Sequence, residues 1–195
     1  MAKNSVEPGL FGAGPALPEG FKYQPELISP AQERELIRRI EPLPLKEFEF
    51  QGFLGKRRVV SFGWRYDFND QELQKADDIP EFLLPLRALA AGFAGLSADS
   101  FRHVLVTEYC PGAAIGWHKD KKMFAEVVGI SLGSACRFRF RRRLGEKWQR
   151  AQILAEPRSA YFLSGPSRTQ WEHSIPAVQQ LRYSVTFRNL AQGLG

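Results

Sequence analysis

The chain has 195 residues, of which 44% are hydrophobic and 25% are charged, and its aromatic residues are 15 Phe, 5 Tyr and 4 Trp. This length allows one well-packed domain with a tail, or two small domains at most, and the apolar content excludes a disordered chain. The 27 Lys and Arg against 21 Asp and Glu give a formal net charge of +6. Such a charge favours a polyanionic partner, although a soluble protein with a basic surface also carries it.

Neither a membrane span nor a disulfide framework is expected. The most apolar stretch, residues 82–96, is shorter than the roughly 18 residues that a span needs, and Pro85 and Arg87 interrupt it. The N-terminus lacks the apolar core of a signal peptide, so we expect a cytoplasmic protein without a membrane partner. We also expect a monomer. Cys110 and Cys136 are too few for a disulfide framework and are expected to stay reduced.

The first 27 residues are rich in Pro and Gly and show no sustained periodicity, which predicts a flexible N-terminal arm that can dock through Phe21 and Tyr23. A helix is predicted over residues 30–42. Ser29 supplies its N-cap, Pro30 fits its first position and Gln32 completes a capping box. Residues 28–195 are expected to form a single domain.

Aromatic and basic residues alternate in short runs over residues 47–69, which is typical of a β-hairpin. We interpret this hairpin as a substrate-recognition surface for nucleic acid, in which Trp64 and Tyr66 stack on bases. Its expected phosphate contacts are Lys56, Arg57, Arg58 and Arg65. The alternative, in which the aromatic residues belong to the core of an ordinary hairpin, remains open.

A second helix is predicted over residues 80–96, and β-like runs dominate the rest of the chain. The predicted strands are 103–109, 127–132, 135–142, 151–155, 159–163 and 181–189. Helices followed by closely spaced strands favour an α+β, mainly β fold, in which N-terminal helices support a sheet sandwich or jelly roll.

Seven basic residues and a single acidic one, Glu146, occupy residues 137–150. The basic residues are Arg137, Arg139, Arg141, Arg142, Arg143, Lys147 and Arg150. Because Phe138 and Phe140 alternate with arginines, we expect the phenylalanines to face inward and the arginines outward. A solvated face would explain this run, but its density favours a surface that follows phosphates.

Two histidines and an aspartate suggest a metal site. His118 and Asp120 are two residues apart, so both side chains would emerge on the same face of an extended strand. His173 is the best candidate for a third ligand, because His103 opens an apolar strand and is expected to be a core or edge residue. Two histidines and a carboxylate, with three open positions, are the arrangement of non-haem Fe(II) oxygenases.

The predicted strand over residues 181–189 places Arg182, Ser184, Thr186 and Arg188 on one face. An exposed strand with its arginines in solvent would also fit this pattern. Beside a metal site, however, inward-facing arginines offer the fork geometry that binds a dicarboxylate co-substrate.

These motifs together resemble the AlkB-like Fe(II)/2-oxoglutarate-dependent dioxygenases. The run from Glu108 to Gly112, followed by Ile115 and His118-Lys119-Asp120, resembles the family's Asn-x-Tyr, Pro-Gly and His-x-Asp block. The strand Ile130–Gly133, the segment Ser167-Arg168 with His173, and the run Arg182–Arg188 resemble its later motifs in the same order. The resemblance spans about residues 105–190.

The resemblance implies a double-stranded β-helix (jelly-roll) core over residues 103–190, with the hairpin 47–69 as a nucleotide-recognition lid. It further implies Fe(II) held by His118, Asp120 and His173, with 2-oxoglutarate and O2 as co-substrates. Tyr109, Arg182 and Arg188 would bind 2-oxoglutarate, and Ser184 takes a position usually held by Asn. Thr107 stands where repair members carry Asn, and Lys122 stands where they carry an acidic residue that contacts the methylated base.

The function that follows from the resemblance is oxidative N-demethylation of alkylated DNA or RNA bases, as in DNA dealkylation repair, with release of formaldehyde, succinate and CO2. The substrate contacts would include Arg58, Trp64, Tyr66 and Lys122. The same iron chemistry on a protein or small molecule is the alternative that Lys122 leaves open. A non-catalytic, basic nucleic-acid-binding domain is the third interpretation.

Overall fold

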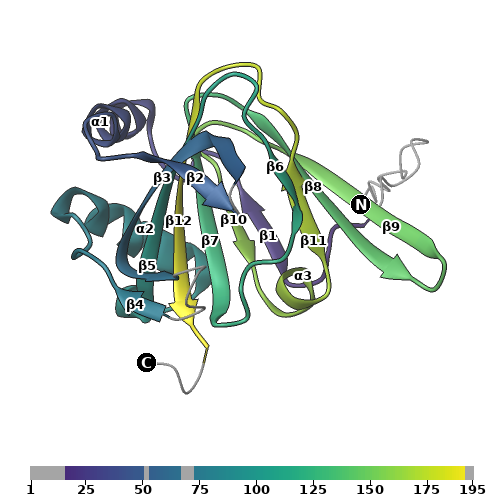
Figure 1. The fold of residues 1–195 in the computed structure, drawn as a ribbon. Helices are drawn as coiled ribbons and strands as arrows, with labels where there is room; N and C mark the ends of the chain where they lie inside the picture. Colours follow the sequence, from purple (N-terminus) through teal and green to yellow (C-terminus); the bar gives the residue numbers. More distant parts are fainter. Residues whose placement is uncertain (1–15, 51–52, 67–72, 192–195) are drawn as a thin grey trace, which may run out of the picture.

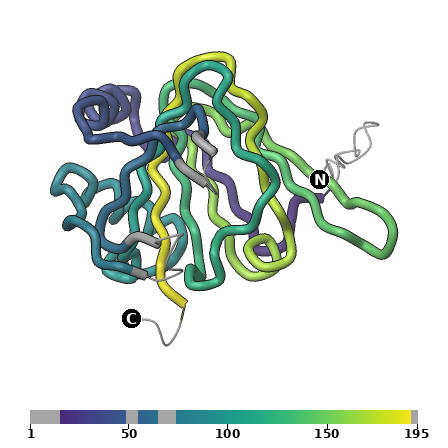
Figure 2. Tube along the Cα trace, in the orientation of Figure 1, coloured from purple at the N-terminus to yellow at the C-terminus, as the bar shows by residue number. Residues whose placement is uncertain are grey.

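The computed structural model describes residues 16–50, 53–66 and 73–191 (Figures 1 and 2). The helices are α1 (Pro30–Ile40), α2 (Leu84–Ala94) and α3 (Gly165–Thr169), with 3-10 turns η1 (Glu81–Leu83) and η2 (Ala98–Ser100). The strands are β1 (Phe21–Gln24), β2 (Lys46–Phe50), β3 (Phe53–Tyr66), β4 (Leu73–Lys75), β5 (Phe101–Tyr109), β6 (Ile115–His118), β7 (Phe124–Leu132), β8 (Cys136–Leu144), β9 (Lys147–Ala155), β10 (Ala160–Leu163), β11 (Glu172–Ile175) and β12 (Arg182–Leu190).

The strands form two antiparallel sheets that face each other. The larger sheet has the order β1-β10-β7-β12-β5-β3-β2, with β4 paired to β3, and the smaller sheet has the order β6-β11-β8-β9. Figure 1 shows α1 and α2 beside the larger sheet and the smaller sheet on its other side. The expected α+β, mainly β jelly-roll fold with supporting N-terminal helices is confirmed.

Successive side chains along the strands of the larger sheet point to its two faces in turn, and each face carries its own apolar cluster. On β12, Tyr183, Val185 and Phe187 belong to the cluster that packs against α1 and α2. Arg182 points the other way and donates a hydrogen bond to Ser131 on β7. Successive side chains of a strand point to opposite faces, so the polar residues of β12 face the space between the two sheets.

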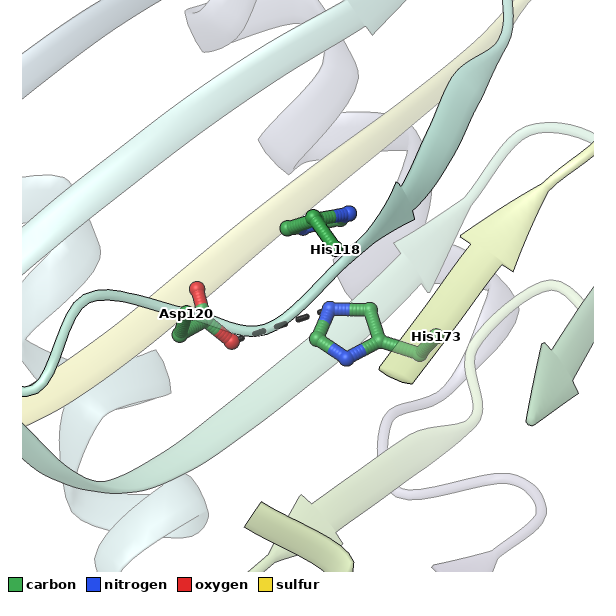
Figure 3. A group of neighbouring side chains, drawn as sticks. All are labelled: His118, Asp120 and His173. Carbon is green, nitrogen blue, oxygen red and sulfur yellow. Dashed lines mark ion pairs between the residues drawn. The ribbon is translucent and has the colours of Figure 1, made fainter. Parts of the chain in front are cut away.

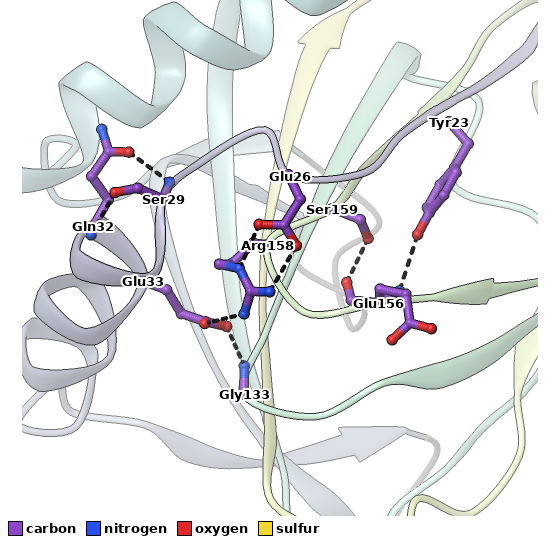
Figure 4. Close-up of polar contacts among 9 residues, drawn as sticks. All are labelled: Tyr23, Glu26, Ser29, Gln32, Glu33, Gly133, Glu156, Arg158 and Ser159. Carbon is purple, nitrogen blue, oxygen red and sulfur yellow. Dashed lines mark hydrogen bonds and ion pairs between the residues drawn. The ribbon is translucent and has the colours of Figure 1, made fainter.

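Helix α1 begins as its sequence predicts and is fixed to the sheet by a buried carboxylate. Ser29 and Gln32 form the expected capping box. Glu33 accepts hydrogen bonds from the Gly133 amide at 2.9 Å and from Arg158 Nη1 at 3.0 Å (Figure 4). Arg158 also pairs with Glu26 at 2.7 Å. These contacts connect the end of the N-terminal segment, α1 and the strand loops of the larger sheet.

Several elements differ from their predicted form. Within the expected arm, Phe21–Gln24 forms β1, which pairs with β10. The predicted helix 80–96 is divided into η1 and α2, and α2 ends at Gly95, whose φ of 73° suits a glycine. The strands β6 and β11 and the helix α3 were not predicted, because each has only four or five residues and no clear periodicity.

Among the described residues, no helix combines the length and apolar character needed to cross a bilayer.

A candidate metal centre between the two sheets

His118, Asp120 and His173 meet at one point of the smaller sheet. His118 ends β6 and His173 lies in β11, and the antiparallel register places the two directly opposite each other. Asp120 follows two residues after His118. The ligand atoms of the three side chains all lie within 4.8 Å of one another (Figure 3), so the group can hold a metal ion. The structure therefore brings together the three residues that the sequence pattern singles out.

Each histidine presents a nitrogen that is suited to a metal. His118 Nδ1 lies 2.9 Å from the carbonyl oxygen of Gly116, and a proton placed on Nδ1 for this bond leaves Nε2 unprotonated. Burial lowers the pKa of His173 to about 3, which keeps its ring neutral at physiological pH. The ring of His173 also stacks on Phe138 with a centroid distance of 5.3 Å.

Asp120 is held in its charged form by Arg188. Arg188 Nη2 and Nε donate to Oδ1 of Asp120 at 2.9 and 3.2 Å, while Oδ2 lies 3.7 Å from His173 Nε2. Burial alone would raise the pKa of Asp120, but the Arg188 guanidinium holds that pKa well below its usual range. One carboxylate oxygen of Asp120 thus accepts hydrogen bonds from Arg188, and the other faces the histidines.

His103 lies behind this ion pair and not among the three ligands. Its Nδ1 is 3.4 Å from Nη1 of Arg188, and its ring packs on Phe124 with a centroid distance of 4.7 Å. Burial, followed by the charge of Arg188, lowers the pKa of His103 well below its usual value. A neutral His103 can therefore accept a hydrogen bond from Arg188, a role that the sequence pattern did not reveal.

The loop that follows Asp120 is fixed by another buried arginine. Arg168 in α3 donates to the carbonyl oxygens of Lys121 and Phe124. It is 6% exposed, so its charge lies in the interior beside the ligand loop. Arg168 of the Ser167-Arg168 pair thus positions the chain between Asp120 and β7.

Arg182 is a buried arginine whose surroundings suit an anionic ligand. Its side chain is fully buried, and Nε donates to Ser131 Oγ at 3.1 Å. Within the described part of the chain, its Nη1 and Nη2 have no hydrogen-bond partner. The guanidinium carbon of Arg182 lies 4.8 Å from the centroid of the Tyr109 ring. A buried arginine with two unpartnered nitrogens is costly unless a ligand occupies them, and a carboxylate matches their fork geometry.

The other residues expected at the co-substrate lie on the same side of the larger sheet. Thr107 and Ser184 are direct cross-strand neighbours and are both buried. Tyr109 is opposite Arg182 in the same pairing. Alternation therefore aligns these side chains with Arg188 along the inner face of β5 and β12.

The side chains of the two adjacent arginines of β3, Arg57 and Arg58, point to opposite faces of the larger sheet. Arg57 is paired with Tyr109 and its guanidinium lies 3.9 Å from the ring of Phe48, and burial lowers its pKa. Arg58, the expected substrate contact, instead donates two hydrogen bonds to Glu108 at 2.7 and 2.8 Å. Because residues 57 and 58 alternate across the sheet, Arg57 faces the candidate site and Arg58 faces away from it.

Trp64, another expected substrate contact, belongs to a hollow that none of the three ligands lines. Trp64 lines this hollow of about 310 Å³ with Ile79, Leu84 and Arg87 near the start of α2. The side chain of Tyr66 lies outside the described residues. Lys122 is exposed, two residues after Asp120.

Comparison with known families finds a match over most of the chain. Residues 20–188 match the family model described as the 2OG-Fe(II) oxygenase superfamily. Among solved structures, the chain is similar to OsALKBH1, with a TM-score of 0.65, 18% identity and coverage of 89% of this chain and 98% of that one. At this identity the structural likeness concerns the fold alone.

Curated relatives cover most of this chain, although several of them are much longer. The mouse protein "tRNA (carboxymethyluridine(34)-5-O)-methyltransferase ALKBH8" is 27% identical over 82% of this chain and 24% of its own length. The Arabidopsis thaliana "Alkylated DNA repair protein ALKBH8 homolog" is 25% identical over 80% of this chain and 51% of its own. Protein L905 of Acanthamoeba polyphaga mimivirus, described as uncharacterized, is 25% identical over 88% of this chain and 85% of its own.

Proposed function

Because the chain belongs to the 2OG-Fe(II) oxygenase superfamily, as an AlkB-like dioxygenase that uses Fe(II), 2-oxoglutarate and O2, we propose that it removes N-alkyl groups oxidatively from bases of DNA or RNA. The observation that carries the proposal is the three-ligand group together with the two buried Nη atoms of Arg182, which have no hydrogen-bond partner among the described residues. When bound, iron with 2-oxoglutarate and O2 supplies the oxidation of a carbon–hydrogen bond, with release of succinate and CO2.

In this proposal, His118, Asp120 and His173 hold the iron. The donor set fits the metal, because imidazole and carboxylate ligands suit Fe(II) and this set leaves positions open for co-substrates. Arg188 keeps Asp120 charged and oriented, and His103 supports Arg188.

Arg182 and Tyr109 bind the carboxylate of 2-oxoglutarate that lies away from the metal. Ser131 orients Arg182 through its Nε, which leaves both Nη atoms available to the carboxylate. Thr107 and Ser184 are buried cross-strand neighbours on the same face of the sheet as Arg182 and Tyr109. The buried setting excludes water, which strengthens each of these charged contacts.

A nucleic-acid substrate is supported by the names of two relatives, which refer to a tRNA uridine and to alkylated DNA. The hairpin β2–β3 is proposed to close over the target nucleotide, with Arg57 as its inward-facing cation. Lys122 favours a second candidate, the same oxidation of a protein or small-molecule substrate, because an exposed lysine cannot pair with a cationic base.

The test is a turnover assay with Fe(II), 2-oxoglutarate, O2 and single-stranded oligonucleotides that contain 1-methyladenine or 3-methylcytosine. We expect succinate and the demethylated base by mass spectrometry, and we expect the loss of both in His118→Ala. Gly92→Ala in α2 is the control, since nothing lies within 4 Å of its added Cβ. Succinate formation without demethylation of any base would contradict the nucleic-acid proposal and favour the second candidate.

A further inference from the structure

The smaller sheet has an outer face that points away from the metal centre. His118 and His173 point between the sheets, so their neighbours in sequence point outward. We define the outer face by the residues that alternation and register place there. They are Trp117 on β6, Glu172 and Ser174 on β11, Arg137, Arg139, Arg141 and Arg143 on β8, and Trp148, Arg150 and Gln152 on β9.

The outer face is strongly cationic. Its five arginines stand against one carboxylate, that of Glu172, which accepts a hydrogen bond from Arg141 Nε at 2.6 Å. Arg141 and Arg150 are direct cross-strand partners. Like charges placed opposite each other destabilise a sheet, so this face is better suited to an anionic partner than to solvent alone.

Two tryptophans hold several of these guanidinium groups in fixed positions. The guanidinium carbons of Arg139 and Arg141 lie 5.0 and 4.5 Å from the ring centroid of Trp117. Those of Arg141 and Arg143 lie 4.5 and 5.7 Å from the ring centroid of Trp148. The Nε atoms of these three arginines donate to Ser174 Oγ, to Glu172 and to the Gly145 carbonyl oxygen, and stacking on an indole leaves the Nη edge of a guanidinium accessible. An ordered row of such donors suits phosphate oxygens, and indole and guanidinium planes also stack with unpaired bases.

The position of this face connects it to the metal centre. Strand β6 is an edge strand of the smaller sheet, and Trp117 immediately precedes the candidate ligand His118. A strand bound at the metal therefore reaches the outer face by passing over a single edge strand. Figure 1 shows that the β8–β9 hairpin extends beyond the rest of the molecule, which lengthens the surface. A nine-residue strand such as β8 spans about 30 Å, enough for several nucleotides.

We propose that the outer face binds the phosphodiester backbone of the substrate's own strand, several nucleotides from the base at the metal centre. This inference rests on the proposed nucleic-acid function and deepens it. The occupant is a single strand, because the flat row of arginines and tryptophans can contact phosphates and unpaired bases together.

The experiment compares two triple variants with the same change in charge. Arg137→Gln/Arg143→Gln/Arg150→Gln removes three exposed arginines from the outer face, and Arg34→Gln/Arg38→Gln/Arg39→Gln removes three exposed arginines from α1. Binding of fluorescent single-stranded RNA and DNA of about 20 nucleotides is measured against salt concentration. Far-UV circular dichroism and thermal melting establish that both variants are folded.

We expect the outer-face variant to bind the oligonucleotides at least about tenfold more weakly. The slope of log affinity against log salt concentration, called the salt slope below, should become about 2 less steep, since each lost phosphate contact removes about 0.7 from it. The α1 variant should bind like the wild type. In turnover, the outer-face variant should raise KM for the oligonucleotide and leave kcat unchanged. The charge-preserving variant Arg137→Lys/Arg143→Lys/Arg150→Lys should recover most of the salt slope. The RNA and DNA arms identify the sugar of the bound strand.

Other outcomes separate the failure of this inference from that of the proposed function. If both triple variants lose affinity equally, the surface assignment is overturned while nucleic-acid binding stands. If the wild type binds neither oligonucleotide, both proposals fail. Tighter binding of the outer face to vesicles of phosphatidylserine than to either oligonucleotide would also overturn the inference.

Discussion

Arg188 and Asp120 form a buried ion pair in which two guanidinium nitrogens hold the same carboxylate oxygen, Oδ1, and leave Oδ2 directed at His173. The pair joins two strands of the fold, since Arg188 lies in β12 and Asp120 follows β6. Its consequence is that the orientation of a candidate metal ligand depends on a residue of the opposite sheet.

The first prediction concerns metal affinity. Arg188→Gln should weaken binding of Mn(II), used as a stable substitute for Fe(II), by about 10- to 100-fold, because a partner that orients a ligand carboxylate has been removed. Isothermal titration calorimetry with the metal alone measures the effect. Arg137→Gln, which changes an exposed arginine, is the control. Unchanged affinity in Arg188→Gln would show that Asp120 does not need this ion pair.

The second prediction uses the two buried Nη atoms of Arg182, which have no hydrogen-bond partner in the part of the chain that the structure describes. Arg182→Met should stabilise the protein without ligands by about 1–3 kcal/mol, because a buried donor that lacks a partner is replaced by an apolar side chain. The same variant should lose the rise in Tm that 2-oxoglutarate causes in the wild type. Thermal melts with and without 2-oxoglutarate test both parts. A destabilised variant that still responds to 2-oxoglutarate would contradict the assignment of Arg182.

The third prediction concerns the close approach of Tyr161 to the backbone of β7. A Cβ added to Gly129 would lie 2.1 Å from Cζ of Tyr161, whose ring is buried. Gly129→Ala should therefore destabilise the fold by about 1–3 kcal/mol in urea denaturation. Gly116→Ala, which meets no atom within 4 Å, should change stability far less. Adding Tyr161→Leu to Gly129→Ala should recover part of the loss, and no recovery would rule out this clash as the cause.

The fourth prediction concerns the pH dependence of stability at Glu108. The hydrogen bonds from Arg58 lower the pKa of Glu108 below its ordinary value of 4.5. A carboxyl whose folded pKa is depressed stabilises the protein above the unfolded pKa, and that stabilisation is lost as the pH falls through the folded pKa. Because Arg58 is half exposed, Glu108→Gln should cost about 1 kcal/mol at pH 7.

Urea denaturation of the wild type and Glu108→Gln at several pH values tests this prediction. The difference in stability should persist down to about pH 5 and shrink below it, since the wild-type carboxyl then takes up a proton. A difference that does not change between neutral and acidic pH would assign the effect to packing and not to the ion pair.

Much of the candidate site could be read from the sequence because its residues follow local rules. The two-residue spacing of His118 and Asp120, and the even spacing of Arg182, Ser184 and Arg188, each imply a shared face on any extended chain. The capping box at Ser29 fixed the start of α1 in the same local way. His173 was singled out by comparison with His103 and then by the resemblance, because no local pattern connects it to the other two ligands.

Which of Arg57 and Arg58 faces the candidate site could be determined only from the tertiary structure. Both are basic residues of one hairpin, and only the register with β5, which pairs Arg57 with Tyr109, determines which one faces the site. The strands β6 and β11 were missed because four-residue strands gain their stability from neighbouring strands and not from their own periodicity.

The mainly β fold, the start of α1, the shared placement of His118 and Asp120 and the cationic run of β8 and β9 follow from the sequence, because alternation and spacing act between residues close in the chain. The tertiary structure was needed to show that His103 supports Arg188, that Arg168 fixes the ligand loop, and that the two Nη atoms of the buried Arg182 have no hydrogen-bond partner among the described residues. These relationships join residues far apart in sequence, and strand register and sheet packing place them.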